Sequence, residues 1–155
     1  MGLMVRRDID LTVTCAKIDA GTTEAFALVG ARFMTKTEDV LEVRFRNDAG
    51  SWNADRERYP DGLYLWLSVR GQDRSMWTID IWLIDEPARQ PDLNHLKTIL
   101  PRLDDKARRT ILEIKGTLAD REGSGSRIPS ALIYEAVVEH GVLTLGQFEA
   151  WLQER

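Results

Sequence analysis

The first half of the chain alternates between apolar and polar residues, as half-buried β-strands do. Four stretches share this pattern and are rich in β-forming residues: 8–16, 38–47, 62–70 and 75–85. The short link 71–74 between the last two predicts an antiparallel hairpin. Residues 23–34 carry apolar side chains at helical spacing, and Thr22 or Thr23 is the expected N-cap.

The second half of the chain has helical periodicity instead. The segments that we expect to be helices are 92–100, 104–121, 129–140 and 144–154. The Gly- and Ser-rich stretch 122–127 predicts a flexible joint. Strands followed by helices indicate an α+β fold: a mixed or antiparallel sheet of about four strands with a helix, then a helical C-terminal region. We place the boundary between residues 1–88 and 89–155.

Composition, cysteine content and net charge limit the class of protein to which this chain can belong. The chain has 155 residues, of which 43% are hydrophobic and 30% charged, as in ordinary globular proteins. No apolar run approaches a membrane span, and the single cysteine, Cys15, rules out an intrachain disulfide, so we expect a cytoplasmic protein with no membrane partner. Cys15 lies in the first strand pattern and is interpreted as a small core residue. The net charge of −4 argues against general nucleic-acid binding.

Two carboxylates, Asp8 and Asp10, lie two positions apart on the first predicted strand. Such side chains share one face of a strand, roughly 7 Å apart along the backbone. Their repulsion is costly without a positive charge between them, and Mg²⁺ favours oxygen ligands of this kind. Ile9, Leu11 and Val13 fall on the other face and should anchor the strand in the core. The alternative is a pair of solvent-facing acids.

A third acid, Asp80, lies in the middle of the apolar strand 75–85. An isolated carboxylate there is costly unless it is paired or binds a metal ion. If this strand is the neighbour of the first, three carboxylates converge and can hold two ions about 3.5–4 Å apart, as in nucleotidyl transfer. Trp82 has the same parity as Asp80 and should line the same face.

The stretch 2–13, Gly-Leu-Met-Val-Arg-Arg-Asp-Ile-Asp-Leu-Thr-Val, resembles the signature of the nucleotidyltransferase superfamily. In that signature two acids separated by one apolar residue lie on a strand, and a third acid follows on a later strand. The segment Ile79-Asp80-Ile81 matches the third acid in type and context. The likeness is to the antibiotic-modifying and minimal members, and it covers residues 2–85 as a palm-like sheet.

This resemblance implies transfer of a nucleoside monophosphate from a nucleoside triphosphate to an acceptor hydroxyl. Two Mg²⁺ ions would be held by the three catalytic acids, Asp8, Asp10 and Asp80. Arg6 and Arg7 are candidates for contacts with triphosphate oxygens, the alternative being a basic N-terminal tail.

Trp82 is the candidate for packing against the nucleotide or the acceptor. The loop 48–61, which carries Trp52, is a candidate lid over an acceptor site. Because the chain is acidic, we expect the acceptor to be a small molecule rather than nucleic acid. The sequence names neither the acceptor nor the nucleotide.

One departure from the superfamily pattern concerns the N-terminus. The family has a Gly-Ser pair and a helix before the two acids, whereas here seven residues precede Asp8 and Gly2 is not followed by Ser. We therefore expect this chain, as given, to transfer nucleotide poorly or not at all, and whether Met1 is the true start stays open. The alternative function is a non-catalytic module of the same fold that binds a partner or forms a homodimer through an exposed apolar sheet edge.

Overall fold

The computed structural model describes residues 2–121 and 128–155, which form two compact units. One unit, Arg7–Leu93, holds the β-sheet, and the other comprises Asn94–Arg155 together with the described N-terminal residues up to Arg6. The predicted α+β class is confirmed. The joint predicted at 122–127 lies outside the described residues.

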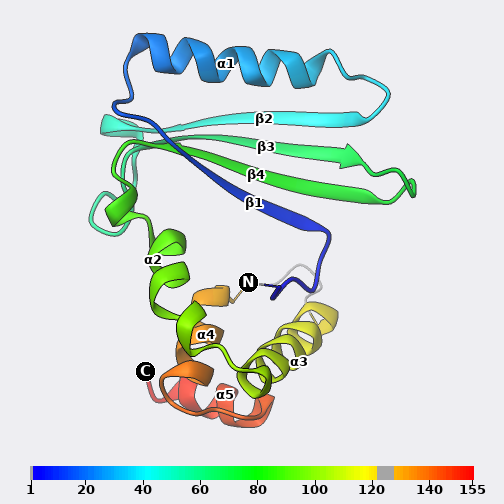
Figure 1. Ribbon diagram of the computed structural model, residues 1–155, viewed down its shortest axis with the longest axis vertical. Coiled ribbons are helices and arrows are strands. Elements are labelled where there is room, and N and C mark those ends of the chain that lie inside the picture. Colours follow the sequence, from blue (N-terminus) through cyan, green and yellow to red (C-terminus); the bar gives the residue numbers. More distant parts are fainter. Residues whose placement is uncertain (1, 122–127) are drawn as a thin grey trace. The chain divides into compact units, whose positions relative to one another are not determined.

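The sheet unit contains four strands in the spatial order β1-β4-β3-β2. Their bounds are Asp8–Thr14 (β1), Val40–Asp48 (β2), Gly62–Arg70 (β3) and Met76–Ile84 (β4). Strand β1 runs parallel to β4, whereas β3 is antiparallel to both β2 and β4 (Figure 1). The four predicted strands and the hairpin between the last two are therefore confirmed.

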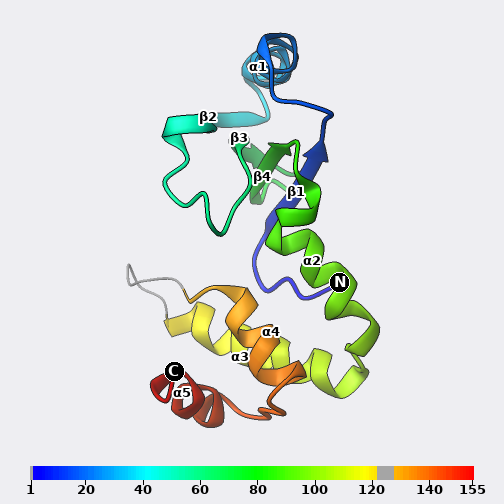
Figure 2. The same ribbon diagram turned by 90° about the vertical axis from the view of Figure 1, so that its left-hand side faces the viewer.

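Helix α1 (Ala20–Met34) connects β1 to β2 and begins earlier than predicted. The N-cap is Asp19, whose Oδ1 accepts the backbone N–H of Thr22 at 3.0 Å. Assignment of the cap to Thr22 or Thr23 was wrong, because Asp is a stronger N-cap than Thr and Gly21 is tolerated within the first turn. Figure 2 shows α1 on one face of the sheet and the loop after β2 on the other.

The core of the sheet unit lies between α1 and the middle strands. Its buried members come from α1, β3 and β4: Phe26, Leu63, Leu65, Leu67, Ile81 and Leu83. Alternation places these side chains on one face of the sheet, so the opposite face keeps the polar and aromatic residues. That second face carries the candidate site.

The apolar face of β1 is not buried, contrary to the expectation that it anchors the strand. Ile9, Leu11 and Val13 are 36%, 46% and 46% exposed. The physical reason is position: α1 contacts β2, while β1 is an edge strand at the far side of the sheet. Cys15 is likewise only half-buried at the margin of the core, where its Sγ donates to the carbonyl of Ile84 at 3.4 Å.

In the described residues four α-helices follow the sheet, as predicted. They are α2 (Pro91–Thr98), α3 (Asp105–Arg121), α4 (Ser130–Val138) and α5 (Leu145–Gln153). The helical unit has its own core around Ile111, Ile114 and Phe148, which Leu3 joins from the N-terminal segment. The part of the chain that the structure describes also includes three short 3-10 helices: η1 (Gly50–Trp52), η2 (Pro87–Arg89) and η3 (Leu100–Arg102). Among the described residues, every helix is too short or too polar to cross a membrane.

The buried leucines of β3 should dominate the stability of the sheet unit. Leu67 is fully buried, so we expect Leu67→Ala to lower the free energy of unfolding by about 3 kcal/mol through lost burial and the cavity that remains. The matched control is Leu41→Ala at a side chain that is 77% exposed, where the change should stay within about 0.5 kcal/mol. Urea denaturation followed by circular dichroism measures both. Equal losses in the two variants would contradict this description of the core.

Candidate functional site

Pairing of β1 with β4 brings the three predicted acids together. Asp10 is the direct cross-strand partner of Asp80, and Asp8 lies two residues earlier on the same face. One carboxylate oxygen from each of the three lies within 4.8 Å of the others. The predicted convergence is therefore found, and the cluster consists of hard oxygen donors that could hold a metal ion.

Two neutral hydroxyl groups support this cluster. Thr78 Oγ1 donates to Asp8 Oδ1 at 2.7 Å, and the Tyr64 hydroxyl donates to Asp80 Oδ1 in a short hydrogen bond. Burial, followed by the hydrogen bond and the charge of Asp80, raises the pKa of Tyr64 far above its ordinary value. Tyr64 therefore remains a proton donor to Asp80 throughout the physiological range. Both hydroxyls reduce the cost of crowding the carboxylates.

Sequence reasoning gave no role to Tyr64 or Thr78. A signal for Tyr64 was present, because Tyr64, Trp66 and Ser68 alternate with buried leucines along β3 and so occupy the polar face. What the sequence did not provide was the register that aligns β3 with β4. In that register Trp66, not Tyr64, is the direct partner of Asp80, and the tyrosine reaches the acid diagonally.

Two arginines of β2 lie on the same face but are occupied by other groups. Arg44 binds Glu42 through Nε–Oε1 at 2.6 Å and lies 4.4 Å from the ring centre of Trp66. Arg46 binds Asp48 at 2.7 Å and lies over the rings of Tyr64 and Trp82. The hydrogen bond from Arg44 lowers the pKa of Glu42.

Trp82 lies on the face that carries the acids. It follows Asp80 by two residues on β4 and contacts the ring of Tyr64 with centres 4.6 Å apart. The ring also lines a cavity, which is described below. A role for Trp82 beside a nucleotide or an acceptor stays a prediction.

The two N-terminal arginines belong to different units. Arg7 forms an ion pair with Asp73 of the β3–β4 turn at 4.0 Å, with both side chains mostly exposed. Arg6 belongs to the helical unit. Contacts of Arg6 and Arg7 with a triphosphate stay a prediction.

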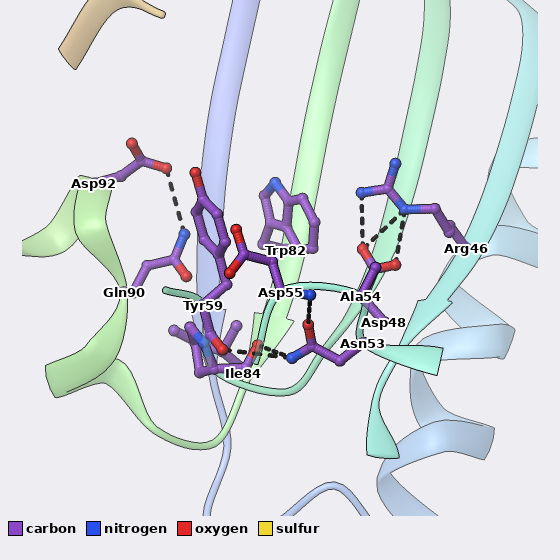
Figure 3. Close-up of a pocket in the computed structure, with 11 residues that line it drawn as sticks. Arg46, Asp48, Asn53, Ala54, Asp55, Tyr59, Trp82, Ile84, Gln90 and Asp92 are labelled. Carbon is purple, nitrogen blue, oxygen red and sulfur yellow. Dashed lines mark hydrogen bonds and ion pairs between the residues drawn. The ribbon is translucent and has the colours of Figure 1, made fainter. Parts of the chain in front are cut away.

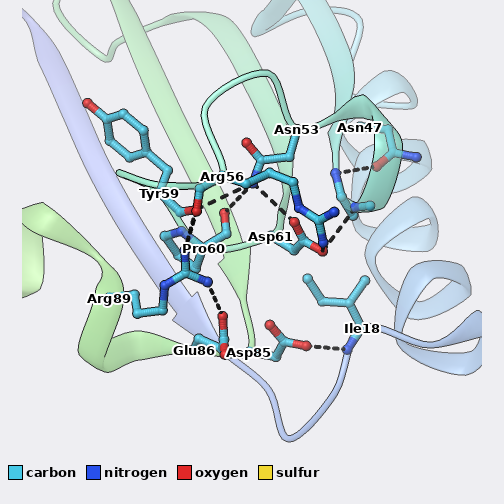
Figure 4. Close-up of polar contacts among 12 residues, drawn as sticks. Ile18, Asn47, Asn53, Arg56, Tyr59, Pro60, Asp61, Asp85, Glu86 and Arg89 are labelled. Carbon is cyan, nitrogen blue, oxygen red and sulfur yellow. Dashed lines mark hydrogen bonds and ion pairs between the residues drawn. The ribbon is translucent and has the colours of Figure 1, made fainter.

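The loop after β2 is held by Asp61 (Figure 4). Its carboxylate accepts the backbone N–H of Gly50 at 3.0 Å and the Nδ2 of Asn53 at 3.1 Å, with Arg56 at 3.7 Å. The hydrogen bond from Gly50 is the main cause that lowers the pKa of Asp61. Trp52, the residue that suggested a lid, is 72% exposed.

Comparisons of the chain with protein-family models, with curated proteins and with solved structures found no significant match. The resemblance to nucleotidyltransferases therefore stays a prediction from the sequence.

The contacts of Asp61 predict that the conformation of the loop after β2 depends on pH. The folded-state pKa of Asp61 is below its unfolded value near 4. The ionised carboxylate therefore stabilises the loop fully above about pH 4, and this stabilisation is lost as the pH falls through the folded-state pKa. We expect the nuclear magnetic resonance signal of the Trp52 indole to move in that range in the wild type. Asp61→Asn should flatten this titration, whereas an unchanged titration in that variant would assign it to another group.

Removal of the carboxylate should also release the loop at neutral pH. Asp61→Ala deletes every acceptor oxygen of the side chain, so we expect faster tryptic cleavage after Arg56 and Arg58 than in the wild type. Asp61→Asn keeps one acceptor oxygen, so its cleavage rate should lie between those of the wild type and Asp61→Ala. Mass spectrometry of the fragments measures the rates. Equal cleavage of all three proteins would contradict this role of Asp61.

Proposed function

We propose that the chain is a nucleotidyltransferase-like protein that transfers a nucleoside monophosphate from a nucleoside triphosphate to an acceptor hydroxyl. The observation that supports this function is the cluster of Asp8, Asp10 and Asp80, with donor oxygens within 4.8 Å of one another on the open face of a sheet. Paired strand carboxylates joined by a third acid form a suitable site for two divalent ions.

Each acid has a distinct part in this proposal. Asp8 and Asp10 would hold both ions, and Asp80 would share the ion nearer to the acceptor and help to activate its hydroxyl. Bound Mg²⁺ would neutralise the charge that develops on the attacking and leaving oxygens. The acceptor oxygen forms a bond to the α-phosphorus as the bond to pyrophosphate breaks. Thr78 and Tyr64 are positioning residues, because each fixes one carboxylate by a hydrogen bond.

Metal binding is the first test of this function. A ligand that binds only the folded state stabilises it by about 2.7 kcal/mol at a concentration of 100 times its dissociation constant. We expect Mg²⁺ to raise the thermal midpoint of the wild type and to leave Asp10→Asn unchanged. The control is Asp39→Asn, because Asp39 is an exposed acid elsewhere in the sheet unit and its variant should respond as the wild type does. Equal responses of Asp10→Asn and the wild type would refute the site.

Transfer itself is tested with labelled nucleoside triphosphates in the presence of Mg²⁺, with release of pyrophosphate as the readout and Asp10→Asn as the control. The same assay bears on the expectation that this chain transfers poorly. Turnover that persists in Asp10→Asn would show that the three acids do not carry the reaction.

The alternative function, a non-catalytic module that forms a homodimer, is favoured by the exposed side of β1. In the part of the chain that the structure describes, β1 has a neighbouring strand on one side only, and it presents three exposed apolar side chains, Ile9, Leu11 and Val13. An unpaired strand edge with an apolar surface is suited to association.

Sedimentation velocity tests this alternative. We expect a concentration-dependent dimer in the wild type that Leu11→Lys abolishes, because a buried lysine would lack a partner charge. Leu41→Lys, at the exposed leucine of the other edge strand, is the matched control and should still dimerise. A wild-type protein that stays monomeric at high concentration excludes the dimer. A dimer without any Mg²⁺ response would favour the module over the enzyme.

A further inference from the structure

A cavity of about 600 Å³ opens on the sheet face that carries the three acids (Figure 3). Its walls come from the ends of β2 and β4, from the loop after β2 and from the start of α2. Trp82 joins the cavity to the acid cluster, because it follows Asp80 by two residues on one face of β4, a spacing of roughly 7 Å. A bound molecule that extends out of this cavity past Trp82 would therefore approach the carboxylates.

The charge of the lining is negative. Three carboxylates, those of Asp48, Asp55 and Asp92, against the single guanidinium of Arg46 leave a formal charge of −2. Arg46 is bound to Asp48 by both Nε and Nη2, so this pair neutralises itself. The remaining negative charge belongs to Asp55 and Asp92.

Of these two acids, Asp55 pairs with one exposed arginine, and Asp92 contacts a neutral amide. Asp55 has Arg58 at 3.9 Å, and the Arg58 side chain is 75% exposed to solvent, where screening weakens the pair. Asp92 accepts a hydrogen bond from the neutral amide of Gln90 at 3.3 Å. A positive ligand would thus be attracted to this end of the cavity, whereas the phosphates of a nucleotide or a nucleic acid would be repelled.

Aromatic side chains complete the lining. The rings of Tyr59 and Trp82 both face the cavity that Asp55 lines, and Pro60 and Ile84 add apolar surface (Figure 3). Aromatic rings next to carboxylates are a common environment for an organic cation, because the ring faces attract positive charge and the rings bury its hydrocarbon part. A simple metal ion would not need such apolar walls.

We propose that this cavity is the acceptor site and that it takes a small organic molecule with a primary amine on a compact ring or hydrocarbon body. The amine lies against Asp55 and Asp92, and the body packs on Tyr59 and Trp82. The assignment as acceptor site rests on the proposed function, because the hydroxyl of the bound molecule would be directed along β4 towards Asp80. The amine site itself depends only on the cavity.

Three probes of one size test the charge preference: benzylamine, benzyl alcohol and benzoate. At pH 7 they carry a positive, a neutral and a negative group on the same ring. We expect only benzylamine to shift the indole N–H signal of Trp82 in nuclear magnetic resonance spectra, with Trp82→Phe used to assign that signal among the five tryptophans. Equal shifts with benzyl alcohol or benzoate, or none with benzylamine, would overturn the proposal.

The acid cluster also attracts cations, so variants are needed to show whether benzylamine binds in the cavity or at the acid cluster. Asp55→Asn and Asp92→Asn should each weaken benzylamine binding by about fivefold, as expected for loss of one nearby opposite charge in a wet site, and should leave the Mg²⁺ response intact. Asp10→Asn should abolish the Mg²⁺ response and leave benzylamine binding intact. Loss of benzylamine binding in Asp10→Asn alone would place the amine on the metal ligands and refute the cavity site.

The proposed nucleotidyltransferase function and the proposed amine site can be refuted independently of each other. Benzylamine binding in a protein that shows no Mg²⁺ response would leave an amine site and refute its role as an acceptor site. A Mg²⁺ response without benzylamine binding would leave the metal centre and refute the cavity. Only both responses, each sensitive to its own carboxylates, support the combined assignment.

Discussion

The register of β1 against β4 is the constraint on which the candidate site depends. It places Asp10 beside Asp80, and because side chains alternate along a strand, Asp8 follows on the same face. A shift of one residue would turn the β1 acids towards the face that carries α1. The register aligns charges that repel one another, so its stability must come from elsewhere. The buried leucines of β3 and the apolar residues of β4 hold the neighbouring strands in place, and β1 adds to their edge.

Neutral hydroxyl groups take part in the hydrogen bonding of the acid cluster on the open face. The arginines of β2, which β3 separates from β4, are bound to Glu42 and Asp48. Two groups that contact the acids are the hydroxyls of Thr78 and Tyr64, which donate hydrogen bonds without adding charge. Neutral donors fix the direction of a carboxylate while leaving its attraction for a metal ion largely intact.

Period-2 patterns were sufficient to predict the strands and the shared face of Asp8 and Asp10, and the order of strands and helices was sufficient to predict the α+β class; the convergence with Asp80 was conditional on β1 and β4 being neighbours. They were not sufficient for features that depend on which elements are neighbours. The buried role expected for Ile9 and Leu11 failed because the position of α1 over the sheet is a tertiary property. The contact of Tyr64 with Asp80 and the cavity near Trp82 likewise require cross-strand register and the path of a loop, neither of which a single sequence encodes locally.

The two faces of strand β1 suit two different interactions, metal binding on one face and association with a partner on the other. One face carries two of the three acids, the other is exposed and apolar, and among the described residues the strand is paired with β4 alone. A divalent ion bound by Asp10 and Asp80 would bridge that ladder and so would stabilise the pairing that creates its own site. A partner on the apolar face would hold the same strand from the other side. Metal binding and association would therefore favour the same conformation of β1, and neither function excludes the other.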